Sequence, residues 1–256
     1  MTFIQRSFDV NTSCAYWVGF SVQYFVVILI PYLSLLREDC RFNEVVFVLD
    51  VSQTIEPSAY KQLKKFTVDI IFKVHQSRSD TSSSSLRSRV GVVTFADRAR
   101  KRIYCDEYTS RVDGVERLNK AIYSLERPGG EIFTNIRDGL VKAKQLLFER
   151  GCGENDLRPG THRKVLVLIS DGRANMGHGG KEGIYKEALD TRRQGITILA
   201  VAVGNMIATD MLQRIVGEKK YYVTGKTLHD VFDNTIVMMD RELCSPTVCK
   251  YAEITS

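Results

Sequence analysis

The chain has 256 residues, of which 44% are hydrophobic and 26% are charged, and its formal net charge is +6. This composition is that of a globular protein, long enough for one domain of about 200 residues with a core that needs no disulfides. The mild positive charge is compatible with acidic polysaccharides, anionic lipid or nucleic acid, and selects none of them. Because there is no zinc-finger spacing and no aromatic-basic RNA-binding module, we expect no nucleic-acid partner.

A stretch without charged side chains lies near the N-terminus, at residues 15–36. Its length matches a membrane-spanning helix and also a long signal-peptide core, while a buried core helix is the alternative. In either of the first two cases, the segment targets the chain to the secretory pathway. We therefore expect a signal peptide or signal anchor at 1–39, a domain at 40–244 and, at 245–256, a tail that begins a further module. The protein would be secreted to the extracellular matrix, or held on the outer side of a membrane only through residues 15–36.

Six cysteines are spread along the chain, and none forms a CxxC pair, so we expect no zinc or thioredoxin-type site. Outside the cytosol such cysteines form disulfides. Cys40 and Cys244 bracket the globular region and are expected to close it at its base. Cys105 and Cys152 are a second candidate pair, although connectivity does not follow from sequence alone.

Strand and helix patterns alternate after Cys40. In chain order they predict a strand at 45–50, a helix at 57–75, a strand at 89–96, a basic turn at 97–102, a strand at 103–108, helices at 112–125 and 136–149, a strand at 164–170, a helix at 183–194, a strand at 196–203, a helix at 209–216, a strand at 220–223 and a helix at 228–243. This order predicts an α/β fold of the doubly wound type, with a mostly parallel central sheet, one antiparallel edge strand and helices on both faces.

Oxygen-bearing side chains gather where the predicted strands end. Asp50, Ser52 and Thr54 follow the first strand at alternate positions, Thr134 precedes a helix, and Asp171 follows the strand at 164–170. In parallel sheets, ligands bind outside the carboxyl ends of the strands. Two carboxylates and three hydroxyls, without sulfur or imidazole, suit Mg²⁺, Mn²⁺ or Ca²⁺. The sequence therefore predicts a divalent-cation site at this edge.

Four segments in this order, FVLDVSQT, PGGEIFTNI, VLVLISDGRAN and ITILAVAVGN, resemble the successive signatures of a von Willebrand factor type A domain over residues 42–243. The resemblance implies a Rossmann-like fold and a metal-ion-dependent adhesion site at the five residues above. In the family the hydroxyl positions can bind the metal directly, and the two aspartates often act through water. It also implies an adhesion module that makes and breaks no bond, and whose partner is a collagen-like or other matrix protein that presents an acidic side chain.

Other functions remain open at this point. The basic residues of the segment DRARKR could bind heparin-like sulfated glycans, or could be a solvated hairpin edge; they are Arg98, Arg100, Lys101 and Arg102. The segment FVLDVSQT also resembles the first motif of haloacid-dehalogenase-type phosphatases, although Ser52 stands where that family has a second aspartate. A third alternative is a structural matrix module that assembles with itself independently of metal.

Overall fold

The computed structural model describes residues 43–53, 57–76, 88–105, 114–126, 131–149, 163–175 and 179–244. Residues Cys40–Cys244 form one compact unit. The predicted targeting segment at 15–36 and the tail at 245–256 lie outside the described residues, and so do Cys40, Thr54 and Cys152. Within the described part of the chain, no helix has the length and apolar character needed to cross a membrane.

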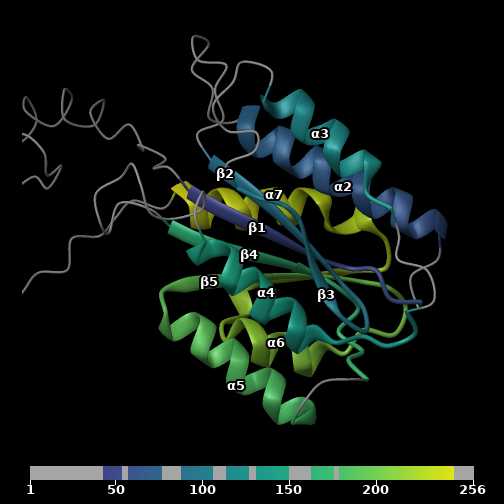
Figure 1. The fold of residues 1–256 in the computed structure, drawn as a ribbon, viewed down its shortest axis with the longest axis vertical. Helices are drawn as coiled ribbons and strands as arrows, with labels where there is room; N and C mark the ends of the chain where they lie inside the picture. Colours follow the sequence, from purple (N-terminus) through teal and green to yellow (C-terminus); the bar gives the residue numbers. More distant parts are fainter. Residues whose placement is uncertain are drawn as a thin grey trace, which may run out of the picture. The chain divides into compact units, whose positions relative to one another are not determined.

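A six-stranded sheet in the order β3-β2-β1-β4-β5-β6 forms the centre of the fold (Figure 1). The strands are β1 (Asn43–Asp50), β2 (Ser88–Phe95), β3 (Ala99–Ile103), β4 (Arg163–Ile169), β5 (Ile196–Val203) and β6 (Tyr222–Gly225). All neighbouring strands pair in parallel except β2 and β3, which are antiparallel. This arrangement confirms the predicted doubly wound fold with one antiparallel edge strand.

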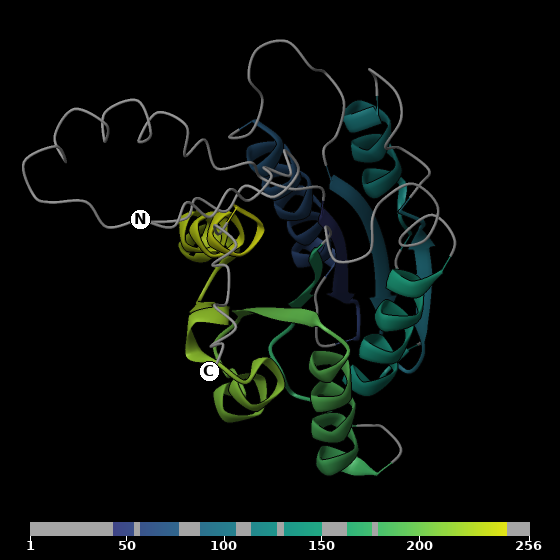
Figure 2. The ribbon, with the colours of Figure 1, turned by 90° about the vertical axis from the view of Figure 1, so that its left-hand side faces the viewer.

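Helices cover both faces of the sheet, as Figures 1 and 2 show. The described helices are α2 (Pro57–Gln76), α3 (Gly114–Ser124), α4 (Ile136–Phe148), α5 (Gly180–Arg193), α6 (Thr209–Val216) and α7 (Leu228–Cys244). One hydrophobic core joins α2, α3 and α7 to one face of the sheet, and a second core joins α4, α5 and α6 to the other. The sheet therefore separates two cores.

The central strand β1 contributes to both cores because its side chains alternate between the two faces. Phe47 and Leu49 belong to the core with α2, α3 and α7, whereas Val46 and Val48 belong to the core with α4, α5 and α6. All four are 1% exposed or less. Burial of each such side chain contributes about 1.5–3 kcal/mol to folding, so β1 is held firmly where it delivers Asp50 to the edge of the sheet.

The predicted turn at 97–102 was wrong in its extent, because Arg100, Lys101 and Arg102 lie on a strand. The turn is shorter, and the N–H of Ala96 donates to the carbonyl of Arg98 across it (3.3 Å). β3 then begins at Ala99 and ends at Ile103, and both of these side chains are buried. The strand predicted at 220–223 is also displaced: residues Lys219–Tyr221 form a 3-10 turn, and β6 follows them.

Glu44 is a buried acid at the start of β1, with 3% of its surface exposed. It lies in register with Arg89 on β2 and Lys164 on β4. Its Oε1 is 3.9 Å from Nη1 of Arg89, and its Oε2 has no hydrogen-bond partner among the residues described. Burial raises the pKa of Glu44 to about 7, although Lys164 and Arg89 act to lower it.

We expect Glu44→Gln to stabilise the protein more at pH 8 than at pH 5. A carboxyl whose pKa is raised by folding binds its proton more tightly in the folded state, so its contribution to stability falls as pH rises from about 4.3 through 7. The free energy of unfolding in urea should show an additional gain of roughly 1–3 kcal/mol at pH 8. Glu116→Gln, on the exposed surface of α3, is the control and should show no such difference. Equal effects of Glu44→Gln at both pH values would contradict the prediction.

Candidate metal centre

Asp50 and Ser52 lie at the carboxyl end of β1 and are 1% and 0% exposed. Oδ1 of Asp50 accepts the N–H of Ser52 (3.0 Å), and Oδ2 accepts the hydroxyl of Ser170 (2.8 Å). The short Asp-x-Ser spacing thus folds the chain back toward the carboxylate, while Ser170 reaches it from the end of the neighbouring strand β4. Thr54, the third predicted ligand of this segment, lies outside the described residues.

Thr134 lies in the loop before α4 and is 1% exposed. Its N–H donates to Oδ1 of Asn175 (2.7 Å), and the N–H of Asn175 donates back to the carbonyl of Thr134 (3.3 Å). The next residue, Asn135, donates its N–H to the carbonyl of Ala96 (2.8 Å). Its side chain accepts the N–H of Asp138 and so caps α4. Thr134 is therefore tied to the loops that follow β2 and β4.

Asp171 follows β4 and is 5% exposed. Its Oδ1 accepts the N–H of Arg173 (2.9 Å), and its Oδ2 accepts Nε of the same arginine (2.7 Å). Its carbonyl accepts the N–H of Ala208, which precedes α6 (2.9 Å). Gly172 continues the loop with a φ of +77°, a conformation that L side chains rarely adopt, and its N–H donates to the hydroxyl of Ser170 (3.0 Å).

The pKa of Asp50 reflects its burial and its neighbours. Burial raises the pKa of Asp50 to about 6; the hydrogen bonds from Ser52 and Ser170 lower it, and the charge of Asp171 raises it further. Among the residues described, no group of three or more His, Cys, Asp or Glu side chains is placed to hold a metal ion. The buried oxygen donors described at this edge are the carboxylates of Asp50 and Asp171 and the hydroxyls of Ser52, Thr134 and Ser170. Two buried carboxyl groups beside hydroxyl oxygens fit a hard divalent cation.

Three residues around these donors were missed by the sequence reasoning. Ser170 donates to Asp50, Asn175 accepts from Thr134, and Arg173 pairs with Asp171. Ser170 and Arg173 lie within two positions of Asp171, so their place next to the predicted ligand was available as a signal. Asn175 carried no such signal, because its partner is 41 residues away.

The basic hairpin was the alternative binding surface. Arg100 forms an ion pair with Glu131, and Lys101 forms one with Glu149. Arg98, in contrast, is exposed at the turn. Two of the four cations are thus partly balanced by carboxylates, which leaves less charge for a sulfated glycan. Glycan binding at this hairpin stays a prediction.

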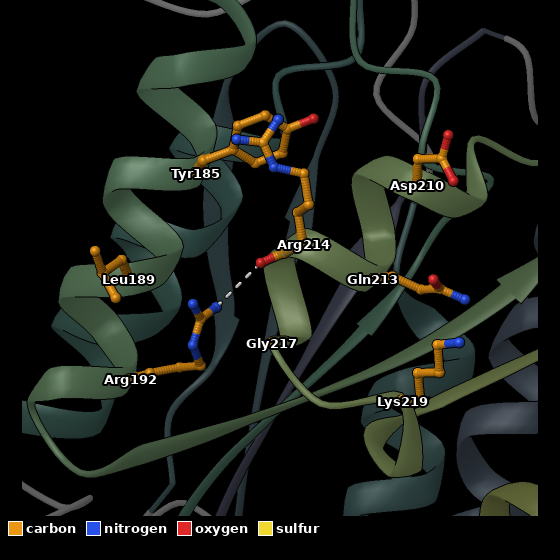
Figure 3. Close-up of a pocket in the computed structure, with 8 residues that line it drawn as sticks. All are labelled: Tyr185, Leu189, Arg192, Asp210, Gln213, Arg214, Gly217 and Lys219. Carbon is orange, nitrogen blue, oxygen red and sulfur yellow. Dashed lines mark hydrogen bonds between the residues drawn. The ribbon is translucent and has the colours of Figure 1, made fainter.

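A groove of about 520 Å³ lies between α5 and α6 (Figure 3). Its lining contains none of the predicted metal ligands; it consists of Tyr185, Leu189, Arg192, Asp210, Gln213, Arg214, Gly217 and Lys219. Nη1 of Arg192 donates to the carbonyls of Ile215 and Arg214 at the end of α6. A Cβ at Gly217 would lie 3.1 Å from Nε of Arg192, so glycine leaves room for this contact. Arg192 therefore satisfies carbonyls at the C-terminus of α6.

Cys105 is buried at the end of the β2–β3 hairpin and is disulfide-bonded. Its partner is not among the side chains that the structure describes, so its pairing with Cys152 stays a prediction. The proposed bond between Cys40 and Cys244 is likewise untested, because Cys40 is outside the described part of the chain.

The chain is similar to a known family and to several known proteins. The model of the von Willebrand factor type A domain matches residues 44–234. Similar proteins include the Xenopus laevis collagen alpha-1(XXI) chain, 26% identical over 84% of this chain and 20% of that protein, and the mouse (Mus musculus) collagen alpha-6(VI) chain, 28% identical over 69% and 7%. Chicken (Gallus gallus) matrilin-1 is 23% identical over 80% of this chain and 39% of its own length. This chain therefore spans less than half of the length of each of these proteins.

Solved structures show the same fold. Proximal thread matrix protein 1 from the mussel byssus, in a form with a zinc-occupied MIDAS motif, has a TM-score of 0.62 and 26% identity over 78% of this chain and 46% of that one. A second crystal form has a TM-score of 0.63 at 19% identity, covering 78% and 48%.

Proposed function

Because this chain belongs to the von Willebrand factor type A domain family, we propose that it is an extracellular adhesion module that binds a matrix protein through a divalent cation. The observation that carries the proposal is the convergence of Asp50, Ser52, Thr134 and Asp171. Loops from three distant parts of the chain bring these buried oxygen donors to one edge of the sheet. The proposed ligand set is Asp50, Ser52, Thr54, Thr134 and Asp171.

The proposed ion is Mg²⁺, with Mn²⁺ or Ca²⁺ as alternatives, because all the donors are hard oxygens. The mussel protein with zinc at its MIDAS motif supports a divalent cation of some kind. A bound ion supplies a positive charge that attracts a carboxylate of the partner. The protein orients the ligands of the ion: Ser170 and the N–H of Ser52 orient Asp50, and Asn175 orients the loop of Thr134. No bond is made or broken in this function.

The proposed setting is the extracellular matrix, where this domain works as one module among others. The named relatives are two collagens and a matrilin, and the matched region makes up 7% to 39% of their own lengths. The disulfide at Cys105 agrees with an oxidising compartment. Collagen-like and other matrix proteins with exposed acidic side chains are therefore the proposed partners.

We expect the full chain to bind immobilised collagens in millimolar Mg²⁺ and to lose this binding in EDTA. Asp171→Ala should abolish the Mg²⁺-dependent signal, because it removes one of the two carboxylates at the site. Asp233→Ala, an equal charge change on the exposed surface of α7, is the matched control and should bind like wild type. The measurement is surface plasmon resonance on a panel of collagen types. Binding that resists EDTA and survives Asp171→Ala would support the metal-independent structural module instead.

A further inference from the structure

Arg173 holds both oxygens of the Asp171 carboxylate. Its backbone N–H donates to Oδ1 (2.9 Å) and its side-chain Nε donates to Oδ2 (2.7 Å). The arginine side chain is 41% exposed, whereas the aspartate side chain is 7% exposed. One residue of the chain thus places a fixed positive charge on a proposed metal ligand, at the rim of the site.

This charge competes with a divalent cation for the same carboxylate. Asp50 and Asp171 provide the negative charge of the site, and the guanidinium of Arg173 offsets part of it. A bound divalent ion would cancel the two carboxylates, and with Arg173 present one positive charge remains. Without Arg173 the site and its ion would be neutral. The arginine therefore opposes cation binding and favours the approach of an anion.

We propose that Arg173 is a built-in counter-ion of Asp171, which weakens cation binding and leaves the loaded site positive toward an acidic partner. This inference rests on the proposed function, because it assumes that a cation binds at Asp171. It adds a residue outside the predicted ligand set that sets the affinity of the site.

The alternative role for Arg173 is to orient Asp171, and the two roles predict opposite results. The orientation of Asp171 is also maintained by backbone groups: its Oδ1 accepts the N–H of Arg173, and its carbonyl accepts the N–H of Ala208. Replacing the Arg173 side chain by Gln or Lys leaves both bonds possible. Loss of the side chain therefore removes chiefly charge, and the cation should bind more tightly.

The test is calorimetric titration of the full chain with Mg²⁺ and with Mn²⁺. We expect Arg173→Gln to lower the apparent Kd for each ion roughly two- to five-fold, as suits an ion pair with a half-exposed arginine. Arg173→Lys keeps the charge and should stay within about two-fold of wild type. Arg214→Gln is the matched control: it makes the same change in net charge at the exposed Arg214–Glu182 pair and should leave the Kd unchanged. Melting curves in EDTA show whether each variant is folded.

The Kd values of these variants either support or overturn the counter-ion role of Arg173. Tighter binding by Arg173→Gln alone supports the counter-ion role. If wild type binds and folded Arg173→Gln binds equally or more weakly, this inference is overturned and the proposed metal site survives. Equal tightening by Arg214→Gln also overturns it, because net charge alone would then explain the effect. If neither wild type nor Arg173→Gln binds either ion, the metal-dependent function fails together with the inference.

Discussion

Replacing Asp50 with asparagine is expected to abolish Mg²⁺ binding while the metal-free domain keeps its fold and at least its wild-type stability. The side chain is 1% exposed, and burial of its charged form is costly. Asparagine has the same shape and no charge. Its Oδ1 can accept the N–H of Ser52, and its Nδ2 can donate to the hydroxyl of Ser170, so both contacts of the carboxylate can be replaced.

The cation loses a buried carboxylate in this variant, so its affinity should fall roughly 100-fold or more. Calorimetric titration with Mg²⁺ measures this loss, and thermal melting in EDTA measures stability without metal. Asp50→Ala is the comparison variant: it also loses the ion, but it leaves the donors of Ser52 and Ser170 without their acceptor and should melt below Asp50→Asn. Saturable Mg²⁺ binding by Asp50→Asn at wild-type affinity would show that the ion binds elsewhere.

Gly172→Ala is expected to destabilise the domain by about 2–4 kcal/mol, through two separate costs. The residue has a φ of +77°, where alanine is strained. In addition, a Cβ at this position would lie 2.7 Å from Cγ and 2.8 Å from Cδ1 of Leu212, a fully buried side chain of α6. The loop that carries Asp171 must then move, so Mg²⁺ binding should weaken as well.

Gly195→Ala separates the two costs. Gly195 has a φ of +80°, but a Cβ there would meet nothing within 4 Å. Its substitution should therefore cost only about 1–2 kcal/mol, the strain of a left-handed alanine. Urea unfolding at one pH gives both values. If the two variants lose equal stability, then Leu212 adapts to the new methyl group and the clash contributes nothing.

The fold was predictable because its central strands are unambiguous in sequence. β1 and β4 contain continuous apolar runs, as strands buried on both faces require; Asp50 ends β1, and Asp171 lies two residues beyond the end of β4. Since parallel strands end at the same edge, Asp50 and Asp171 could be placed together without coordinates. The edge strand of the basic hairpin was misplaced because three consecutive basic residues, Arg100, Lys101 and Arg102, are typical of a solvated turn. In the fold, buried Ala99 and Ile103 anchor the same residues in an edge strand.

The contacts that complete the site could not be predicted from the sequence. Asn175 meets Thr134 only because the loop after β4 lies beside the loop before α4, and no local pattern links the two. The pairing of Arg173 with Asp171 depends on the turn at Gly172 and on the side-chain conformation of Arg173. Such contacts follow from loop geometry, which hydrophobic periodicity does not specify.

The hydrogen bond between Ser170 and Asp50 joins residues 120 positions apart. During synthesis, β1 leaves the ribosome long before its neighbour β4, and it must remain incompletely paired until more than 100 further residues have followed. Closing so long a loop is entropically costly and slow, which places the assembly of this edge late in folding. An ion bound there can therefore do little to guide the early chain. By mass action, it stabilises only the finished domain.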